Sequence, residues 1–251
     1  MRGFGLLQHG GSVLTLMLFT FLYALPLTPG VWLVMRVLET GPIWGTGAWA
    51  EALSIAVAVI SAYFLWGLGL LVLSGGLQRL THPRVPQGGR KEVPLASLTT
   101  IQWAFCGILH RITMPYLKLL VPSGFANLYF QLAGMKLGRG VQITSEIIND
   151  AYLHRLGDRV VIGGGATLNG HTVEHGRLIL SGVTVEDGAL VGGTSLVQPG
   201  VTVGANAVIA NRAVVPKFKS IPSNEVWAGL PARFLKRRGG SEPSNQALEE
   251  S

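Results

Sequence analysis

Residues 183–215 read VTVEDGALVGGTSLVQPGVTVGANAVIANRAVV, with an aliphatic residue at every sixth position from Val185 onward. The full series comprises Val173, Ile179, Val185, Val191, Val197, Val203, Ile209 and Val215. Leu156, Ile162 and Leu168 keep the same interval one residue out of phase, which indicates that one residue is missing between Leu168 and Val173. A repeat of short, fixed period is typical of solenoid proteins.

Small residues and turn formers also hold fixed places in each hexad. Glycine or asparagine commonly follows the aliphatic residue, as at Gly157, Gly163 and Asn169, and can adopt the backbone angles of a corner. Small or branched residues stand four places after the aliphatic ones, at Val160, Ala166, Thr172, Val183, Ala189, Ser195, Val201, Ala207 and Ala213. Each hexad therefore predicts one short strand and one corner, with the aliphatic side chain inside.

The predicted architecture is a triangular prism. Three hexads close one coil, and successive coils stack as parallel strands about 4.8 Å apart. An α-helix is excluded because an interval of six does not return to one helical face. An ordinary sheet with alternate burial is the alternative, but the unbroken phase of the aliphatic residues argues against it. With Leu137 and Ile143 as first rungs, we predict a mainly β catalytic domain over residues 133–216, a parallel β-helix of four to five coils.

Two long uncharged runs precede this domain, Val13–Met35 and Ala52–Leu77. Each exceeds the roughly 20 residues with which a helix crosses a bilayer. We predict an α-helical transmembrane hairpin over residues 1–77, kinked at Pro26 and Pro29, which membrane helices tolerate. A signal peptide is the alternative for the first run, but its apolar stretch is too long and lacks a nearby cleavage site. A buried helix of a soluble core is the alternative for the second.

The charge is distributed unevenly. The chain carries a net charge of +7, yet residues 1–76 are neutral overall. The connector Val37–Glu51 contains no lysine or arginine, whereas Arg79, Arg84, Arg90 and Lys91 follow the second run. The positive-inside rule then places both termini and the β-helix in the cytoplasm. The prediction is an integral protein of the cytoplasmic membrane, with Arg36 at the outer end reaching back to the interface.

The segments that flank the β-helix are less regular. Residues 78–100 are polar and rich in proline and glycine, which predicts an irregular linker. Residues 101–132 are apolar with scattered cations, which favours interfacial helices on the membrane surface. A re-entrant element and ordinary soluble packing remain alternatives for these residues. We expect a closing segment at 217–238 and a disordered tail at 239–251.

Composition excludes several classes of protein. Only 13% of the residues are charged and 48% are hydrophobic, the opposite of a disordered chain. Basic residues cluster only at Lys236, Arg237 and Arg238, so nucleic acid is not an expected partner. Cys106 is the only cysteine, which excludes an intrachain disulfide framework and a cysteine zinc cage.

Three features together resemble the hexapeptide-repeat acyltransferases. They are the sequence LGRGV at Leu137–Val141, the hexads, and the closing WAGLPARFL at Trp227–Leu235, in which Gly-x-Pro-Ala precedes a basic residue. The resemblance covers roughly residues 130–237. It implies a left-handed β-helix, homotrimers, and acyl-coenzyme A, most simply acetyl-coenzyme A, bound in a groove between neighbouring prisms.

A narrower likeness concerns the sequence TLNGHTVEHGR at Thr167–Arg177. It is similar to the His-x-x-Glu stretch in membrane-linked terminal domains of some peptide synthetases and polylysine synthetases. That likeness implies amide-bond formation with aminoacyl groups held as carrier-protein thioesters. The sequence contains no adenylation or carrier domain.

Acyl transfer from a thioester needs a base for the attacking hydroxyl or amine and hydrogen-bond donors for the oxyanion. His171 lies where the repeat slips in phase and is the candidate general base, since histidine titrates near neutrality. Glu174, three residues later, or Asp150, on an earlier coil, could hold the imidazole in one tautomer. His154 and His175 are reserve bases.

Candidate residues for coenzyme A lie along the prism edge and at its exit. Small residues would admit the pantetheine arm, cations would contact the phosphates, and amides of Gly192 and Gly193 would serve the oxyanion. The set comprises Gly192, Ser195, Ala210, Lys217, Trp227 and Arg233.

Two further functions compete with acyl transfer at the cytoplasmic membrane face. Some hexapeptide prisms resemble carbonic anhydrases, which bind zinc through three histidines. His171 and His175 are four residues apart rather than the five of that family, so we expect no metal. A non-catalytic membrane scaffold is the other alternative. The acceptor is expected to be a small molecule or a lipid-linked group, and no motif in the sequence identifies it.

Overall fold

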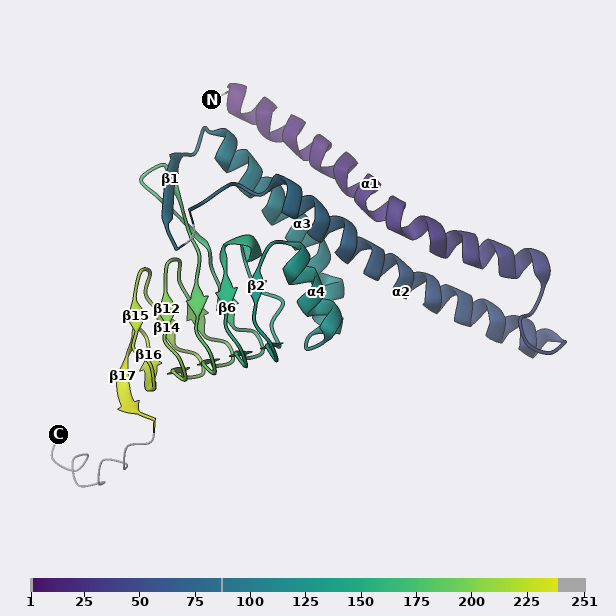
Figure 1. Ribbon diagram of the computed structural model, residues 1–251. Coiled ribbons are helices and arrows are strands. Elements are labelled where there is room, and N and C mark those ends of the chain that lie inside the picture. Colours follow the sequence, from purple (N-terminus) through teal and green to yellow (C-terminus); the bar gives the residue numbers. More distant parts are fainter. Residues whose placement is uncertain (1, 87, 239–251) are drawn as a thin grey trace. The chain divides into compact units, whose positions relative to one another are not determined.

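The computed structural model describes residues 2–86 and 88–238, with side chains from residue 16 onward. The predicted disordered tail, residues 239–251, lies outside the described residues. The chain divides into two compact units between Gly76 and Leu77. The first contains α1 (Arg2–Thr40) and most of α2 (Ala48–Thr81), which confirms the predicted helical hairpin (Figure 1).

Small residues bring the two helices of the hairpin into close contact. A Cβ atom at Gly30 would lie 2.7 Å from Cβ of Ala62, and one at Gly69 would lie 3.0 Å from Cβ of Pro26. Such close approach between helices is typical of membrane proteins. Helix α1 continues through Pro26 and Pro29.

Both helices are long and apolar enough to cross a membrane, over Leu16–Thr40 and Ala48–Thr81. Only 17% and 28% of their most apolar windows are buried. A helix inside a soluble core would be mostly buried, so this exposure argues against that alternative for either helix.

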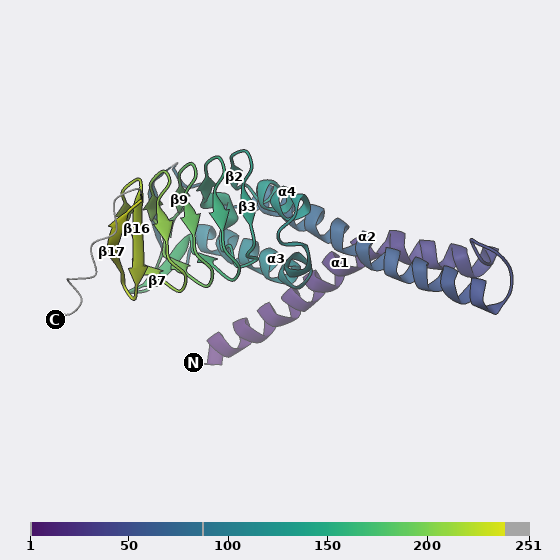
Figure 2. The same cartoon turned by 90° about the horizontal axis from the view of Figure 1, so that it is seen from below.

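The second unit is built around a parallel β-helix of about five coils, as the hexads predict (Figures 1 and 2). Its first two coils contain β2 (Lys136–Leu137), β3 (Gln142–Ile143), β4 (Arg155–Leu156), β5 (Val161–Ile162) and β6 (Thr167–Leu168). The next two contain β9 (Thr184–Val185), β10 (Leu190–Val191), β11 (Leu196–Val197), β12 (Thr202–Val203), β13 (Val208–Ile209) and β14 (Val214–Val215). The end is formed by β15 (Ser220–Ile221), β16 (Glu225–Gly229) and β17 (Ala232–Arg237).

Three sheets form the sides of the prism, and each is a stack of strands from successive coils. Their orders are β2-β4-β9-β12-β15, β3-β5-β10-β13-β16-β17 and β6-β11-β14, with every coil-to-coil pair parallel. Most of the predicted interior residues are buried; Ile162, Val191 and Ile209 are fully enclosed. Burial of these aliphatic side chains is what stabilises the stack.

One part of the predicted repeat is wrong. Val173 and Ile179 are not rungs of the prism but pair with the opposite strand of a β-hairpin, β7 (His171–Glu174) with β8 (Arg177–Ser181). Val173 is 47% exposed. Leu168 and Val185 lie on consecutive strands of the prism, β6 and β9, which a regular hexad would place six residues apart. They are 17 residues apart, so the phase shifts because the hairpin inserts 11 residues at this corner, one fewer than two hexads, rather than because a residue was lost from a coil.

The predicted irregular linker contains a strand and the end of a helix. Helix α2 continues to Thr81, and β1 (Arg90–Pro94) pairs antiparallel with β8, which gives a three-stranded sheet of order β1-β8-β7. An ion pair of 2.6 Å between Arg177 and Glu92 joins the two strands. Pairing with the hairpin, which is distant in sequence, makes a strand of a segment whose composition favours a loop.

Helices α3 (Leu98–Leu120) and α4 (Gly124–Leu132) cover the start of the β-helix (Figure 2). Nε2 of His110 lies 3.1 Å from the carbonyl oxygen of Glu146, and the Asn127 amide donates to the carbonyl of Val141. The expected helices at 101–132 are therefore present, and their inner faces pack against the first coil. Their outer faces expose apolar side chains, including Leu98, Ile101 and Phe125.

Candidate active site

The chain leaves the prism at the same corner in two successive coils. Ile148 in the first coil bridges to Leu168 in the second, and each is followed by an excursion, residues 149–154 and 169–183. The first excursion contains a short 3-10 turn, and the second contains the β7–β8 hairpin. Stacking of the coils therefore brings the beginnings of both excursions together.

This stacking places Asp150 beside His171. Nδ1 of His171 donates to Oδ2 of Asp150 at 2.6 Å. The Asp150 side chain is only 3% exposed, and that of His171 is 29% exposed. Because the carboxylate holds the proton on Nδ1, the lone pair of the neutral ring is on Nε2. Nε2 has no hydrogen-bond partner among the described residues.

The surroundings of His171 act on its pKa in opposite directions. Burial lowers the pKa of the imidazole, while the hydrogen bond and the charge of Asp150 raise it. The two effects of Asp150 together exceed that of burial, and the pKa lies above the ordinary 6.5. His171 is therefore a stronger base than an ordinary histidine, which suits it to accept a proton.

A pocket of about 320 Å³ opens beside the imidazole. One face of α3 forms most of its wall, and the Trp103 ring meets His171 edge to face at 4.7 Å. The residues of α3 that line the pocket are Trp103, Ala104, Gly107, Ile108, His110, Arg111 and Met114. A mostly apolar cavity with a few polar groups is the usual form of a small-molecule site.

Gly170 allows the carboxylate to approach the imidazole. A Cβ atom at this position would lie 2.7 Å from Cβ of Asp150 and 3.1 Å from Oδ2. A side chain at residue 170 would therefore displace the carboxylate. Asp150 itself adopts left-handed backbone angles, with φ of 60°, which aspartate tolerates better than most residues.

The other predicted acid–base residues lie elsewhere. Glu174 accepts hydrogen bonds from Lys217 and from Thr172, and the Lys217 bond is the main reason that its pKa lies below the usual value. His154 is buried and links the Asn149 carbonyl to the amide of Val183. His175 occupies the turn of the hairpin with φ of 48°. Among the predicted partners, the structure brings Asp150 to His171 and does not bring Glu174.

The residues predicted for coenzyme A form no single cluster. Gly192 and Ala210 follow β10 and β13 on one edge of the prism, and the carbonyl of Trp227 in β16 accepts from the Ala210 amide. Ser195 is buried and donates to the carbonyl of Gly192.

The two predicted cations lie apart from that edge. Lys217 forms an ion pair with Glu174, and Arg233 is the strand partner of Ala228 in the closing hairpin. None of the residues predicted for coenzyme A lines the pocket beside His171.

The amides proposed for the oxyanion are already bonded. The Gly192 amide donates to the carbonyl of Ile209, and the Gly193 amide donates to Oδ1 of Asn211. A Cβ atom at Gly192 would lie 2.6 Å from the amide nitrogen of Asn211. Gly192 thus serves the close stacking of coils rather than an oxyanion.

The α3 residues of the site, Trp103 and Arg111 among them, and Gly170 were not predicted from the sequence. No feature of the hexad pattern connects α3 with His171. Gly170 directly precedes the predicted base, but only the position of Asp150 reveals its role. Within residues 2–86 and 88–238, no group of three or more His, Cys, Asp or Glu side chains could hold a metal ion.

Comparison with known proteins gives one curated relative and several solved structures. No protein-family model matches the chain. It is 28% identical over 197 residues to a Delta-poly-L-ornithine synthetase of Acinetobacter baumannii (strain AB307-0294). The match covers 76% of this chain but 14% of that protein, so the chain spans a small part of this relative's length.

The solved structures to which the chain is similar include three acetyltransferases. A hexapeptide-repeat acetyltransferase from Vibrio cholerae O1 biovar eltor, complexed with acetyl-coenzyme A, is 21% identical with a TM-score of 0.43, over 52% of this chain and 88% of that one. A maltose O-acetyltransferase from Clostridium difficile 630 is 16% identical with a TM-score of 0.41, over 60% and 94%. A serine acetyltransferase from Brucella abortus strain S19 is 22% identical with a TM-score of 0.37, over 72% and 78%.

Proposed function

We propose that the chain is an acyltransferase that moves an acyl group from a coenzyme A thioester to a hydroxyl or amine acceptor, with His171 as general base. The observation that carries the proposal is the bond between Asp150 and His171, which leaves Nε2 without a partner among the described residues in a pocket. A carboxylate, an imidazole and an open cavity in this arrangement support base catalysis.

The reaction divides into two proton transfers. As the acceptor attacks the thioester carbonyl carbon, Nε2 of His171 takes its proton and the imidazole becomes positively charged. Asp150 stabilises that charge and keeps the ring oriented. Collapse of the tetrahedral intermediate breaks the carbon–sulfur bond, and the imidazolium returns the proton to the departing thiolate. The products are the acylated acceptor and the free thiol.

Arg111, rather than the amides of Gly192 and Gly193, would stabilise the oxyanion. It lines the same pocket as His171, whereas the amides of Gly192 and Gly193 are bonded within the prism. A guanidinium close to the reacting carbonyl would stabilise the oxyanion as charge develops on it.

The acceptor belongs at the membrane surface in this proposal. Both long helices expose apolar side chains, and cations follow the second, which favours anchoring with the β-helix on the cytoplasmic side. The α3 wall of the pocket offers Trp103, Ile108 and Met114, which suit an acceptor or acyl group with an apolar part. We include in the proposal a homotrimer that binds the coenzyme between neighbouring prisms.

A second candidate function is amide-bond formation from an aminoacyl group held as a carrier-protein thioester. The likeness to a Delta-poly-L-ornithine synthetase favours it, as does the similarity of residues 167–177 to the terminal domains of such enzymes. The same base would then deprotonate an amine acceptor. The two functions differ in the donor and not in the role of His171.

Donor specificity tests the proposal. Full-length protein in detergent is offered acetyl-coenzyme A, a longer acyl-coenzyme A, or an ornithyl or lysyl pantetheine thioester, together with a bacterial lipid and metabolite extract. Thiol release is followed, and the acylated product is identified by mass spectrometry. We expect acceptor-dependent thiol release from a coenzyme A thioester. Consumption of the aminoacyl thioesters alone would support amide formation, and consumption of neither would contradict both functions.

A further inference from the structure

A second cavity of the β-helix unit, about 420 Å³ in volume, shares no lining residue with the pocket beside His171. Three cations line it: Arg79 from the last turns of α2, Lys136 from β2 and Arg155 from β4. The rings of His82 and Tyr152, which stack at 5.0 Å and 14°, also belong to its wall. No carboxylate is among the described residues that line this cavity.

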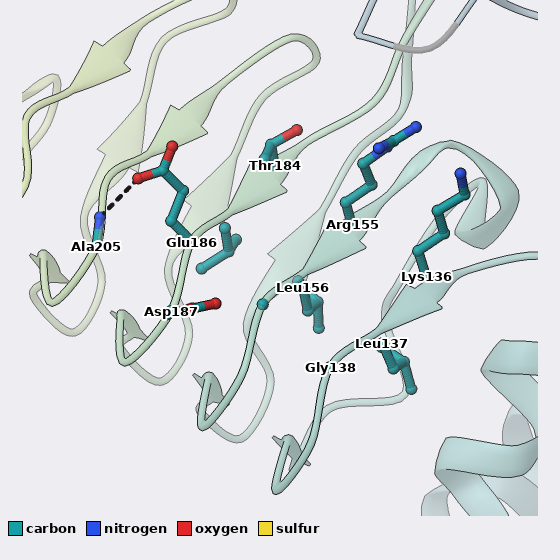
Figure 3. Close-up of a pocket in the computed structure, with 11 residues that line it drawn as sticks. Lys136, Leu137, Gly138, Arg155, Leu156, Thr184, Glu186, Asp187 and Ala205 are labelled. Carbon is teal, nitrogen blue, oxygen red and sulfur yellow. Dashed lines mark hydrogen bonds between the residues drawn. The ribbon is translucent and has the colours of Figure 1, made fainter.

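The β-helix fixes two of the cations next to each other. Lys136 and Arg155 are partners across the parallel pair β2–β4, so their side chains leave the same face of one sheet. Figure 3 shows the two side chains extending to the same side from neighbouring strands. Thr184 is the next residue in this row and adds a hydroxyl group.

Gly134 lies next to the third cation and makes room for Tyr152. A Cβ atom at this residue would lie 2.9 Å from Cβ of Tyr152 and 3.7 Å from Nη1 of Arg79. The guanidinium of Arg79 therefore lies close to the space that a side chain at position 134 would enter. Gly134 has φ of 108°, which also favours glycine here.

These cations have no acidic partner in the part of the chain that the structure describes. Arg79, Lys136 and Arg155 take part in none of its ion pairs. The acids of the adjoining groove in Figure 3 are bonded to the main chain: Glu186 accepts from the Ala205 amide at 3.0 Å, and Asp187 from the Asp158 amide at 2.8 Å. Three positive charges around one cavity repel one another, and a bound anion would offset that repulsion.

The donors suit a phosphate group. Two guanidinium forks, an ammonium and a hydroxyl group can contact several oxygens of a tetrahedral anion at once, and arginine binds phosphate with two parallel hydrogen bonds. Arg79 comes two residues after the apolar run that ends at Leu77. In a membrane-anchored chain it would therefore lie at the level of the lipid headgroups.

We propose that Arg79, Lys136 and Arg155 form a phosphate-binding site whose ligand is the headgroup of an anionic membrane lipid. The phosphate site rests on the contacts of the β-helix unit alone. The lipid as its source rests in addition on the proposed membrane anchoring. Neither depends on acyl transfer, so the site stands or fails independently of the activity of His171.

Binding of short-chain lipids to the full-length protein in a nonionic detergent tests the site. Titration calorimetry compares dihexanoyl phosphatidate, inorganic phosphate and dihexanoylglycerol, which lacks the phosphate. We expect phosphatidate to bind, and to bind more tightly than phosphate, while dihexanoylglycerol gives no saturable binding. Arg155→Gln and Lys136→Gln each remove a charged hydrogen bond and should raise the Kd at least about tenfold.

Matched variants separate a built site from general charge. Arg139→Gln removes an exposed cation of the same coil that does not line the cavity, and should leave the Kd unchanged. Lys136→Arg keeps the charge and should retain most of the binding. Equal binding of phosphate and phosphatidate, with the same dependence on the variants, would keep the phosphate site and overturn the lipid as ligand. Absence of binding by either, or equal weakening by Arg139→Gln, would overturn the site.

Discussion

Oδ2 of Asp150 lies 2.6 Å from Nδ1 of His171, although the two residues are 21 positions apart in the sequence. They meet because each follows the third side of its coil, and the two coils are stacked, as the bridge between Ile148 and Leu168 shows. The stacked coils therefore hold the beginnings of the two excursions next to each other, which places the carboxylate beside the imidazole.

Asp150→Asn should change both the rate and its pH dependence. His171 must be neutral to accept a proton, so wild-type activity should rise with pH and reach half its maximum above pH 6.5, because the pKa of His171 is raised. The variant loses the effects that raise this pKa, so its midpoint should move to lower pH. Its maximal kcat should fall about 10²-fold or more, since the imidazolium loses its counter-charge.

The measurement is kcat from pH 5.5 to 9 for wild type and Asp150→Asn, with binding of the donor determined separately. An unchanged midpoint in the variant would contradict the coupling of the two groups.

Glu174→Gln should leave the chemical step intact. Glu174 bonds to Lys217 and Thr172 on the surface, and no hydrogen bond joins it to His171. We expect kcat within about twofold of wild type and the same pH midpoint, as for other surface changes away from a site. A loss as large as that of Asp150→Asn would restore Glu174 as the partner of the imidazole.

Gly170→Ala should impair catalysis through Asp150. The new methyl group would meet Cβ of Asp150 at 2.7 Å, so the carboxylate must move. We expect kcat to fall at least about tenfold, with little change in KM for the donor, because the geometry of the base is disturbed. The matched control is Gly164→Ala on the same coil, where the nearest atom, Cγ2 of Thr144, would be at an ordinary 3.8 Å. Equal effects of the two substitutions would show that Gly170 has no special role.

Two aliphatic residues distinguish the true register of the repeat from the predicted one. Ile162 is fully buried in the prism, so Ile162→Ala should lower the free energy of unfolding by about 2–5 kcal/mol. Val173, which the hexad pattern also places inside, is 47% exposed on the hairpin, and Val173→Ala should cost only about 0.5 kcal/mol. Chemical denaturation in detergent measures both, and similar losses would contradict the hairpin.

Acid should destabilise the fold through its buried histidines. Burial is the main reason that the pKa of His110 falls to about 4, and it lowers the pKa of His154 as well. In the unfolded chain both would take up a proton near pH 6.5, so the free energy of unfolding should decrease as the pH falls from 6.5 towards 4. The melting temperature of His110→Gln should depend less on pH over this range than that of wild type. Parallel curves for the two proteins would contradict this assignment.

The sequence predicts the prism well because its interior side chains repeat at a fixed interval. Each coil repeats the same interior environment, so the same kind of aliphatic side chain is needed one coil later, as at Val191 and Ile209. Val173 and Ile179 match the six-residue interval by chance. A hairpin also alternates buried and exposed residues, and the distance from Val173 to Val185 happens to equal two hexads. Periodicity alone cannot separate the two structures.

The candidate site is only partly predictable. His171 was found because it stands at the phase break, and Asp150 because coils stack residues that are distant in sequence. Trp103 and Arg111 reach the site on α3, whose position depends on contacts such as that between His110 and the Glu146 carbonyl. No repeat encodes such packing between a helix and a coil, so the pocket itself could be found only in the structure.

The central claim is tested most directly by the rate of thiol release for His171→Ala at saturating donor and acceptor. The account predicts a fall of about 10²-fold or more, with the elution volume of the protein unchanged, because the base is lost and the fold is not. His175→Asn, which keeps a residue suited to the left-handed turn of the hairpin, should retain wild-type activity. Equal activity of His171→Ala and wild type would contradict the account.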